Sequence, residues 1–390
     1  MSPGGGAAGA ARTRPAGAGT PSSPVPAPTQ HDAAYFDYLE GVKIYNYSRH
    51  VPAVLSRYFD RAAANGTVPV TADEAGAIIS ADPLYALTAQ TQRVAQELAW
   101  RSAAASVAPH REALGEMLGN VPGTAGGRLE LETGVTVPDW YADAAHQGND
   151  IHLQPYWGDE LIGAIYERGG GIYRTAWRAG YGKDPAALIA FAKTAPRHEY
   201  ARILDLGCAF GSNTLAFRLA YPGAGEVVGI DLSAQALRWA HLLAEDRGVA
   251  VTYSRRDVAH TGYPGESFDL ITGFLLLHEM PPEWVDATIA EAFRLLRPGG
   301  HLMFLDIPRF AVLTPEAEFL HRFDTRGNGE RYWEAFLSRD FPALLEGAGF
   351  TDVCEGPLDY DDPHYWGSAA LMRCGEFRAV NRWTTHASRP

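Results

Sequence analysis

The chain has few cysteines, no excess of positive charge and no long hydrophobic run. Its 3 cysteines are scattered and never form a Cys-x-x-Cys pair, so we expect neither a disulfide framework nor a zinc site. The formal net charge is −13 and no Lys/Arg-rich run occurs, which argues against nucleic acid as a partner. No apolar run could span a bilayer, and the N-terminal segment lacks the hydrophobic stretch of a signal peptide. We therefore expect a cytoplasmic protein without a membrane partner.

Composition divides the 390 residues into four segments. Residues 1–30 are mostly Gly, Ala, Pro, Ser and Thr, and we expect a disordered tail. Residues 31–120 follow a helical pattern with a capping box at Thr71–Glu74, which predicts a helical accessory domain. Residues 121–200 are irregular and rich in aromatic side chains; they either cover a substrate as a lid or only connect two domains. Residues 201–380 alternate strands and helices.

This alternation predicts an α/β fold with a doubly wound, mostly parallel sheet and helices on both faces. In such a sheet, ligands bind at the carboxyl ends of the strands. The expected strands are residues 203–206, 226–231, 249–253, 268–277, 301–306 and 369–374.

The first strand breaks into a turn of small residues. Asp205 lies in the strand, and Gly207, Ala209 and Gly211 follow before Ser212 opens a helix. A turn of this kind presents backbone N–H groups to a ligand, and small residues let the ligand approach the main chain. An acid beside the turn disfavours phosphate and favours an amino group, which indicates a cofactor that carries an amino acid. The alternative is that Asp205 only caps the turn.

Two further acids lie near the ends of the next strands. Asp231 follows Gly211 by about twenty residues, where doubly wound folds bind a ribose diol, and Asp257 follows the third strand. A nicotinamide cofactor would require Gly-x-Gly-x-x-Gly, but Ala209 and Ser212 replace two of these glycines, which argues against an oxidoreductase. A helix N-terminal charge at Asp231 and an ordinary loop acid at Asp257 are the structural alternatives.

With these motifs the sequence resembles the class I S-adenosylmethionine-dependent methyltransferases over about residues 200–310, and loosely over 340–375. Leu204–Gly211 is similar to the family's first motif, Val228–Asp231 to its second, and Arg256–Val258 to the position whose acid meets the adenine amino group. The resemblance implies a seven-stranded sheet and S-adenosylmethionine as the cofactor. The binding residues that it implies are Asp205, Gly207, Ala209, Gly211, Asp231, Leu232, Asp257, Val258 and Phe274.

A histidine follows the fourth strand. Methyl transfer needs an acceptor lone pair in line with the sulfonium methyl, and a base helps when the acceptor is a hydroxyl or a protonated amine. In related small-molecule O-methyltransferases a His in a Leu-His-Asp-like setting is the base, and Leu277–Glu279 is similar to it. We expect His278, with Glu279, in the catalytic site; packing or helix capping is the alternative role for His278.

Two clusters of polar and aromatic residues are candidates for the acceptor site. The second cluster, Asp359–Trp366, could cage an amine or hold a metal, although a solvated acidic loop is the simpler interpretation. Because no second ligand set has recognisable spacing, we expect no metal. The first cluster, which we predict to contact the acceptor, comprises His152, Gln154, Tyr156 and Trp157.

Together these features predict a methyltransferase of the EC 2.1.1 class that acts on a small molecule such as a secondary metabolite. Nucleic acid as the acceptor is disfavoured by the acidity, and by Leu277–Met280 at the position where base methyltransferases carry an Asn/Asp-Pro-Pro-aromatic signature. The alternative is a non-catalytic S-adenosylmethionine-binding regulator or partner subunit. The aromatic-rich N-terminal half could also form a homodimer interface.

Overall fold

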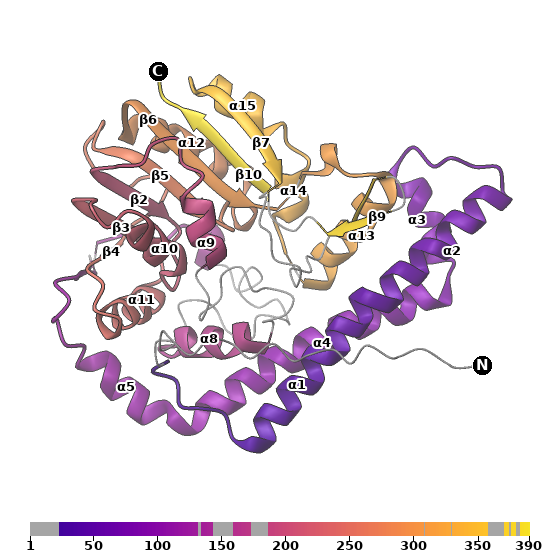
Figure 1. Ribbon diagram of the computed structural model, residues 1–390, viewed down its shortest axis with the longest axis horizontal. Helices are drawn as coiled ribbons and strands as arrows, with labels where there is room; N and C mark the ends of the chain where they lie inside the picture. Colours follow the sequence, from indigo (N-terminus) through magenta and orange to yellow (C-terminus); the bar gives the residue numbers. More distant parts are fainter. Residues whose placement is uncertain are drawn as a thin grey trace, which may run out of the picture.

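The fold was analysed in a computed structural model, which describes residues 23–131, 134–142, 159–172, 186–307, 309–328, 330–357, 370–373, 376–379 and 383–390. An arm of long helices from the N-terminal part of the chain lies beside an α/β unit (Figure 1). None of the helices in these ranges has the combination of length and apolarity that crossing a membrane requires.

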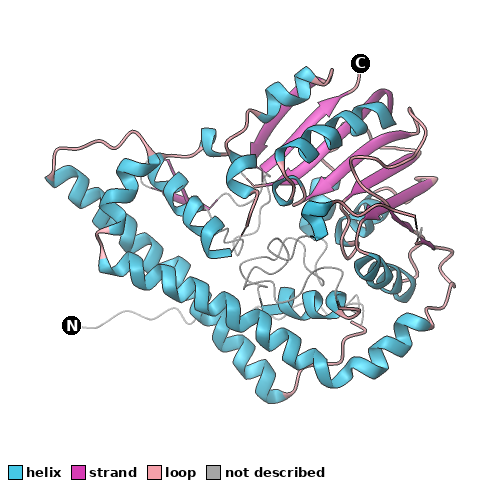
Figure 2. Ribbon diagram, turned by 180° about the vertical axis from the view of Figure 1, so that it is seen from behind, coloured by secondary structure: helices cyan, strands magenta, loops and turns pink. Residues whose placement is uncertain are grey.

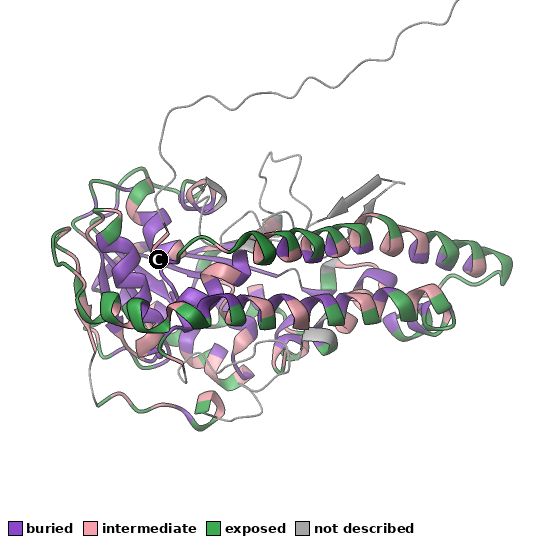
Figure 3. Cartoon of the chain, turned by 90° about the horizontal axis from the view of Figure 1, so that it is seen from below, coloured by how far each residue is buried: buried purple, intermediate pink, exposed green. Residues whose placement is uncertain are grey.

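The N-terminal arm is helical, as the sequence predicts. Thr71 and Glu74 form the expected capping box: the Thr71 hydroxyl accepts from the Glu74 N–H at 3.2 Å, and the Glu74 carboxylate accepts from the Thr71 N–H at 3.2 Å. Along the helices, buried and exposed positions alternate, as amphipathic packing requires (Figure 3). The helices of the arm are α1 Gln30–Tyr45, α2 Val51–Ala64, α3 Ala72–Ser80, α4 Pro83–Val107 and α5 Arg111–Gly119.

Residues 23–29, which belong to the segment expected to be a tail, pack against the protein just before α1 begins at Gln30. Val25 is buried in one cluster with residues of α1, α4 and α8 (Ile162–Ile172). The Arg168 guanidinium of α8 also donates to the carbonyl oxygen of Pro26. One apolar residue in a run of Pro, Ser and Thr gives little sequence signal, which is why this contact was missed.

The α/β unit is built on an eight-stranded sheet in the order β1-β4-β3-β2-β5-β6-β10-β7. The strands from β1 to β6 pair in parallel, whereas β10 is antiparallel to both of its neighbours. The predicted mostly parallel α/β sheet is therefore confirmed. Its strands are β1 Arg128–Glu130, β2 Arg202–Leu206, β3 Glu226–Asp231, β4 Thr252–Arg255, β5 Phe268–Phe274, β6 Leu296–Asp306, β7 Thr351–Pro357 and β10 Trp383–Ser388.

Three details of the sheet differ from the expectation. The expected seven strands are eight, because β1, from the segment expected to be a connector, pairs with β4 at the edge. The strand expected at 369–374 is β8 (Ala370–Arg373), which pairs instead with β9 (Glu376–Ala379) in a separate two-stranded sheet. The main sheet also contains β10, so the α/β unit extends past residue 380, where the sequence analysis ended it. Among the described residues, the element that precedes β10 is the strand β9 and not a helix, so the alternation that identified the other strands gave no signal there.

Helices cover both faces of the sheet (Figure 2). On one face, apolar residues of β2, β5 and β6 pack with those of α12, α14 and α15. On the other face, α9 and α10 pack against Ile203 and Leu270, both fully buried. Burial of this kind stabilises the fold by about 1.5–3 kcal/mol for each large apolar side chain. These and the remaining helices are α6 Asp139–Ala142, α9 Ala186–Ala192, α10 Ser212–Ala220, α11 Ala234–Asp246, α12 Pro282–Leu295, α13 Pro315–Asn328, α14 Trp333–Leu337 and α15 Phe341–Gly347.

Candidate functional site

The loop between β2 and α10 has a left-handed backbone at three positions. The φ angles are +59° at Gly207, +44° at Ala209 and +79° at Gly211. Two backbone hydrogen bonds fix the loop: the Cys208 N–H donates to the carbonyl oxygen of Ile230 in β3 at 2.9 Å, and the Gly211 N–H donates to the Cys208 carbonyl at 2.8 Å. At Ala209 the left-handed conformation costs roughly 1–2 kcal/mol, since the residue has a Cβ atom. The rest of the loop must offset this strain.

Asp231, at the end of β3, ties this loop to the next helix. One carboxylate oxygen accepts from the Ala209 N–H at 2.9 Å, and the other accepts from the Ser233 N–H at 2.8 Å. Burial raises the pKa of Asp231, although these hydrogen bonds oppose the rise. Each carboxylate oxygen has lone pairs beyond these bonds, so Asp231 can also accept from a ligand.

Asp257 is held in a similar way after β4. It accepts from the Ala259 N–H at 2.9 Å and lies 3.3 Å from the indole Nε1 of Trp284. The side chain is buried, and these two donors fix its orientation. Asp231 and Asp257 therefore present two carboxylates at the ends of neighbouring strands.

Asp205 has a different environment from the one we expected. It is fully buried, and its two oxygens accept from the Asn213 amide at 2.7 Å and the Thr214 hydroxyl at 2.6 Å. Burial raises the pKa of Asp205 to about 7. Both donors come from α10, so the carboxylate joins the strand to the helix behind the loop.

A cavity of about 220 Å³ opens beside the loop, at the carboxyl ends of the strands. Among the described residues, seven of the nine predicted cofactor-binding residues line it, and so do His278 and Glu279. The exceptions are Asp205 and Gly211, so the structure does not bring these two to the cavity. Gly211 instead packs against the Tyr253 ring, where any Cβ would overlap the hydroxyl.

The cavity also contains residues that the sequence analysis missed. They come from the helical arm, from α6, from the segment between α13 and α14 and from the first residue of α14, so segments that are far apart in the chain surround one cavity. Their abundant aromatic side chains were the only available signal, since no motif marks these positions. Six of them are Gln96, Trp100, Trp140, Tyr141, Glu330 and Trp333.

His278 lies in a short 3-10 helix, η3 (Leu277–Glu279), directly after β5. Its Nδ1 is 2.5 Å from Oδ1 of Asp306, the last residue of β6. The other oxygen of Asp306 accepts from the Leu277 N–H at 3.0 Å, and Oδ1 also accepts from the Ile307 N–H at 2.9 Å. The imidazole packs on the Trp333 ring, with the two ring centres 5.1 Å apart. Asp306 therefore fixes the imidazole in one orientation.

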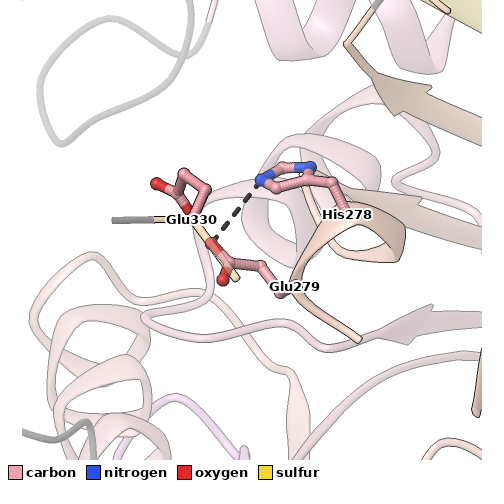
Figure 4. A group of neighbouring side chains, drawn as sticks. All are labelled: His278, Glu279 and Glu330. Atoms are coloured by element: carbon pink, nitrogen blue, oxygen red, sulfur yellow. Dashed lines mark ion pairs between the residues drawn. The ribbon is translucent and has the colours of Figure 1, made fainter. Parts of the chain in front are cut away.

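Two glutamates face the other ring nitrogen (Figure 4). His278 Nε2 lies 3.5 Å from Glu279 Oε1, and Glu330 completes the group. Burial lowers the pKa of His278, but the charges and hydrogen bonds of Asp306 and Glu279 outweigh it and raise the pKa well above its usual value. Burial and the charge of Glu279 raise the pKa of Glu330 well above its usual value, and the charge of His278 opposes the rise.

The first predicted acceptor cluster, His152, Gln154, Tyr156 and Trp157, lies outside the described residues, and so does Asp359–Trp366. The role of both clusters stays a prediction.

Comparisons with known proteins agree with this geometry. Residues 203–300 match the family described as "Methyltransferase domain". An uncharacterized methyltransferase of Synechocystis is 33% identical over 155 residues, which is 39% of this chain and 68% of that protein. The 27-O-demethylrifamycin SV methyltransferase of Amycolatopsis mediterranei is 33% identical, covering 36% of this chain and 55% of that protein. The ubiquinone biosynthesis O-methyltransferase of Hahella chejuensis is also 33% identical, with 40% of this chain and 64% of that protein covered.

Among solved structures, phosphoethanolamine N-methyltransferase 2 of Haemonchus contortus, in complex with S-adenosyl-L-methionine, has a TM-score of 0.43 at 16% identity. The match covers 60% of this chain and 57% of that one. The family match at residues 203–300 includes the β2–α10 loop and the two strand-end acids, and the Synechocystis relative is matched over 68% of its length. The chain therefore belongs to the class I S-adenosylmethionine-dependent methyltransferases.

Proposed function

We propose that the cavity binds S-adenosylmethionine along the β2–α10 loop, and that the chain transfers its methyl group to a small-molecule acceptor beside His278. One observation carries this proposal: a single cavity joins the loop, Asp231 and Asp257 to the His278–Asp306 pair. The acceptor would enter between the helical arm and η3. A homodimer and a cytoplasmic location stay predictions.

The residues present fit the cofactor. Asp231 has lone pairs for the two ribose hydroxyls, and Asp257 with the Val258 main chain suits the adenine amino group. Aromatic and aliphatic side chains make up most of the remaining wall, which suits an adenine ring. The cavity contains no Lys or Arg among its described lining residues, as expected for a ligand with a sulfonium and an ammonium group.

When bound, the cofactor supplies an electrophilic methyl group. The protein positions the acceptor and removes its proton. Asp306 accepts the Nδ1–H of His278, which leaves Nε2 to take a proton from an acceptor hydroxyl or protonated amine. Because the acidic neighbours raise the pKa of His278, the neutral base becomes available as the pH rises well above 6.5.

The experiment that tests this proposal follows the transfer of a tritiated methyl group from S-adenosylmethionine. The purified chain is incubated with a panel of phenols, aliphatic alcohols and amines, and the formation of S-adenosylhomocysteine is measured in parallel. We expect transfer to at least one class, with a loss of about 100-fold or more in His278→Gln. Binding of S-adenosylmethionine without transfer to any class would favour the non-catalytic regulator.

A further inference from the structure

Three side chains with metal-ligating atoms converge on the acceptor side of the cavity. His278 and Glu279 come from η3, and Glu330 comes from the segment between α13 and α14 (Figure 4). One ligand atom from each residue lies within 4.8 Å of the other two. All three residues line the cavity that also contains Asp231 and Asp257. The group was invisible in the sequence, because about fifty residues separate Glu330 from the other two.

The orientation of His278 suits a metal ligand. Its Nδ1 is bound to Asp306, so its Nε2 is directed toward the two glutamates. A histidine that ligates a metal usually donates its other ring N–H to a carboxylate in this way, because the second bond fixes the ring and increases the basicity of the ligating nitrogen. Asp306 is itself fixed by the N–H groups of Leu277 and Ile307.

The charges of the group also favour a cation. Glu279 and Glu330 are two like charges within ligand distance of each other, in a cavity whose described lining residues include four carboxylates and no Lys or Arg. At this separation the two carboxylates repel each other when both are ionised. A divalent ion between the two carboxylates would replace this repulsion with attraction.

We propose that His278, Glu279 and Glu330 bind a divalent transition-metal cation, of which Mn²⁺ and Zn²⁺ are the probes to use, next to the methyl acceptor. One imidazole and two carboxylates are a ligand set that these ions accept. Ligand atoms at about 2.0–2.2 Å from an ion lie about 3–4 Å from one another. A small rotation of one glutamate side chain would bring the three ligand atoms, now within 4.8 Å of one another, to these distances.

A bound cation would narrow the chemical class of molecules that can be the methyl acceptor. This step rests on the proposed methyl transfer. A hydroxyl in contact with the ion has a lowered pKa and loses its proton to solvent. The acceptor oxygen then forms the O–CH₃ bond as the S–CH₃ bond of the sulfonium breaks, and the ion is unchanged. In the loaded enzyme His278 is a ligand, and the ion takes over its role in ionising the acceptor. The acceptor is therefore a hydroxylated molecule.

The test is a titration of the purified full chain with Mn²⁺ at pH 7.5, with free Mn²⁺ measured by electron paramagnetic resonance. Zn²⁺ is titrated separately by calorimetry. We expect one site per chain, and an affinity at least about tenfold weaker in Glu330→Gln and in Glu279→Gln, since even an outer partner of a ligand contributes that much. The matched control is Glu283→Gln, an exposed carboxylate four residues from Glu279, which should bind as the wild type does. Thermal unfolding shows that each variant is folded.

The inference is overturned if neither ion binds, or if binding is undiminished in both variants. Since the titration contains no S-adenosylmethionine and no acceptor, its outcome is independent of whether methyl transfer occurs. Conversely, methyl transfer that is unaffected by chelators, in a chain that binds no ion, would remove the metal site and leave the proposed function intact.

Discussion

His278 Nδ1 and Asp306 Oδ1 lie 2.5 Å apart, and this contact joins the end of β6 to the turn after β5. The two residues are 28 positions apart in sequence and meet because β5 and β6 are parallel neighbours. The contact fixes which ring nitrogen faces the cavity. Both chemical roles that we propose for His278, proton acceptor and metal ligand, depend on that orientation.

The first prediction concerns Asp306. Asp306→Asn should lower kcat by roughly 100-fold, because the imidazole loses the partner that orients it and stabilises its charged form. Asp306 acts through His278, so the pH profile of the metal-free enzyme, measured in the presence of a chelator, is the diagnostic readout. The charge of Asp306 helps to raise the pKa of His278, so in the variant the rising limb of activity should move to lower pH, toward 6.5. A profile that keeps its position while kcat falls would contradict this positioning role.

A second prediction concerns the cofactor side of the cavity. Asp231→Ala should weaken the binding of S-adenosylmethionine by about tenfold or more, because it removes an acceptor from the ligand and leaves the Ala209 and Ser233 N–H groups without their partner. Calorimetry measures the affinity. Asp246→Asn, an exposed acid at the end of α11, is the control and should bind normally. Equal affinity in both variants would remove Asp231 from the site.

The third prediction is that the buried carboxyl group of Asp205 makes the free energy of unfolding depend on pH. Its pKa is about 7 in the folded chain, against about 3.9 in an unfolded one, so the folded state retains the proton over that interval. A raised folded pKa means that the contribution to stability is complete below about pH 3.9 and is lost as the pH rises to about 7.

The measurement is the free energy of unfolding of the wild type minus that of Asp205→Asn, from denaturant titrations at several pH values. The difference should fall by up to about 1.4 kcal/mol per pH unit between about pH 4 and 7, and then level off. The variant removes this one titration and leaves the others as a common background. Parallel curves for the two proteins would show that Asp205 does not titrate in this range.

A fourth prediction tests the turn itself. Gly211→Ala should lower stability by about 1–3 kcal/mol, because the position has a φ of +79° and a new Cβ would overlap the Tyr253 hydroxyl. Gly223→Ala is the matched control, with nothing within 4 Å of the new Cβ and no left-handed backbone. Thermal unfolding compares the two. Similar midpoints would mean that the turn tolerates a side chain at residue 211.

The sequence predicted those parts of the molecule that local patterns encode. The position of Asp231 at the end of a strand was predicted, because a strand end followed by a helix start is readable from a few consecutive residues, and the residue lines the cavity there. The environment of Asp205 was not predicted, since its partners Asn213 and Thr214 contact it only after the helix packs behind the strand. Glu330 has no sequence signal at all: it reaches His278 through the packing of α14 on η3, which is a long-range contact.

Calorimetric titration of the purified chain with S-adenosylmethionine and, separately, with NADH tests the central claim most directly. The site predicts micromolar binding of S-adenosylmethionine and none of NADH, because carboxylates line the cavity at Asp231 and Asp257 and no described lining residue is a Lys or Arg that could bind a pyrophosphate. Binding of NADH, or binding of neither ligand, would contradict the account.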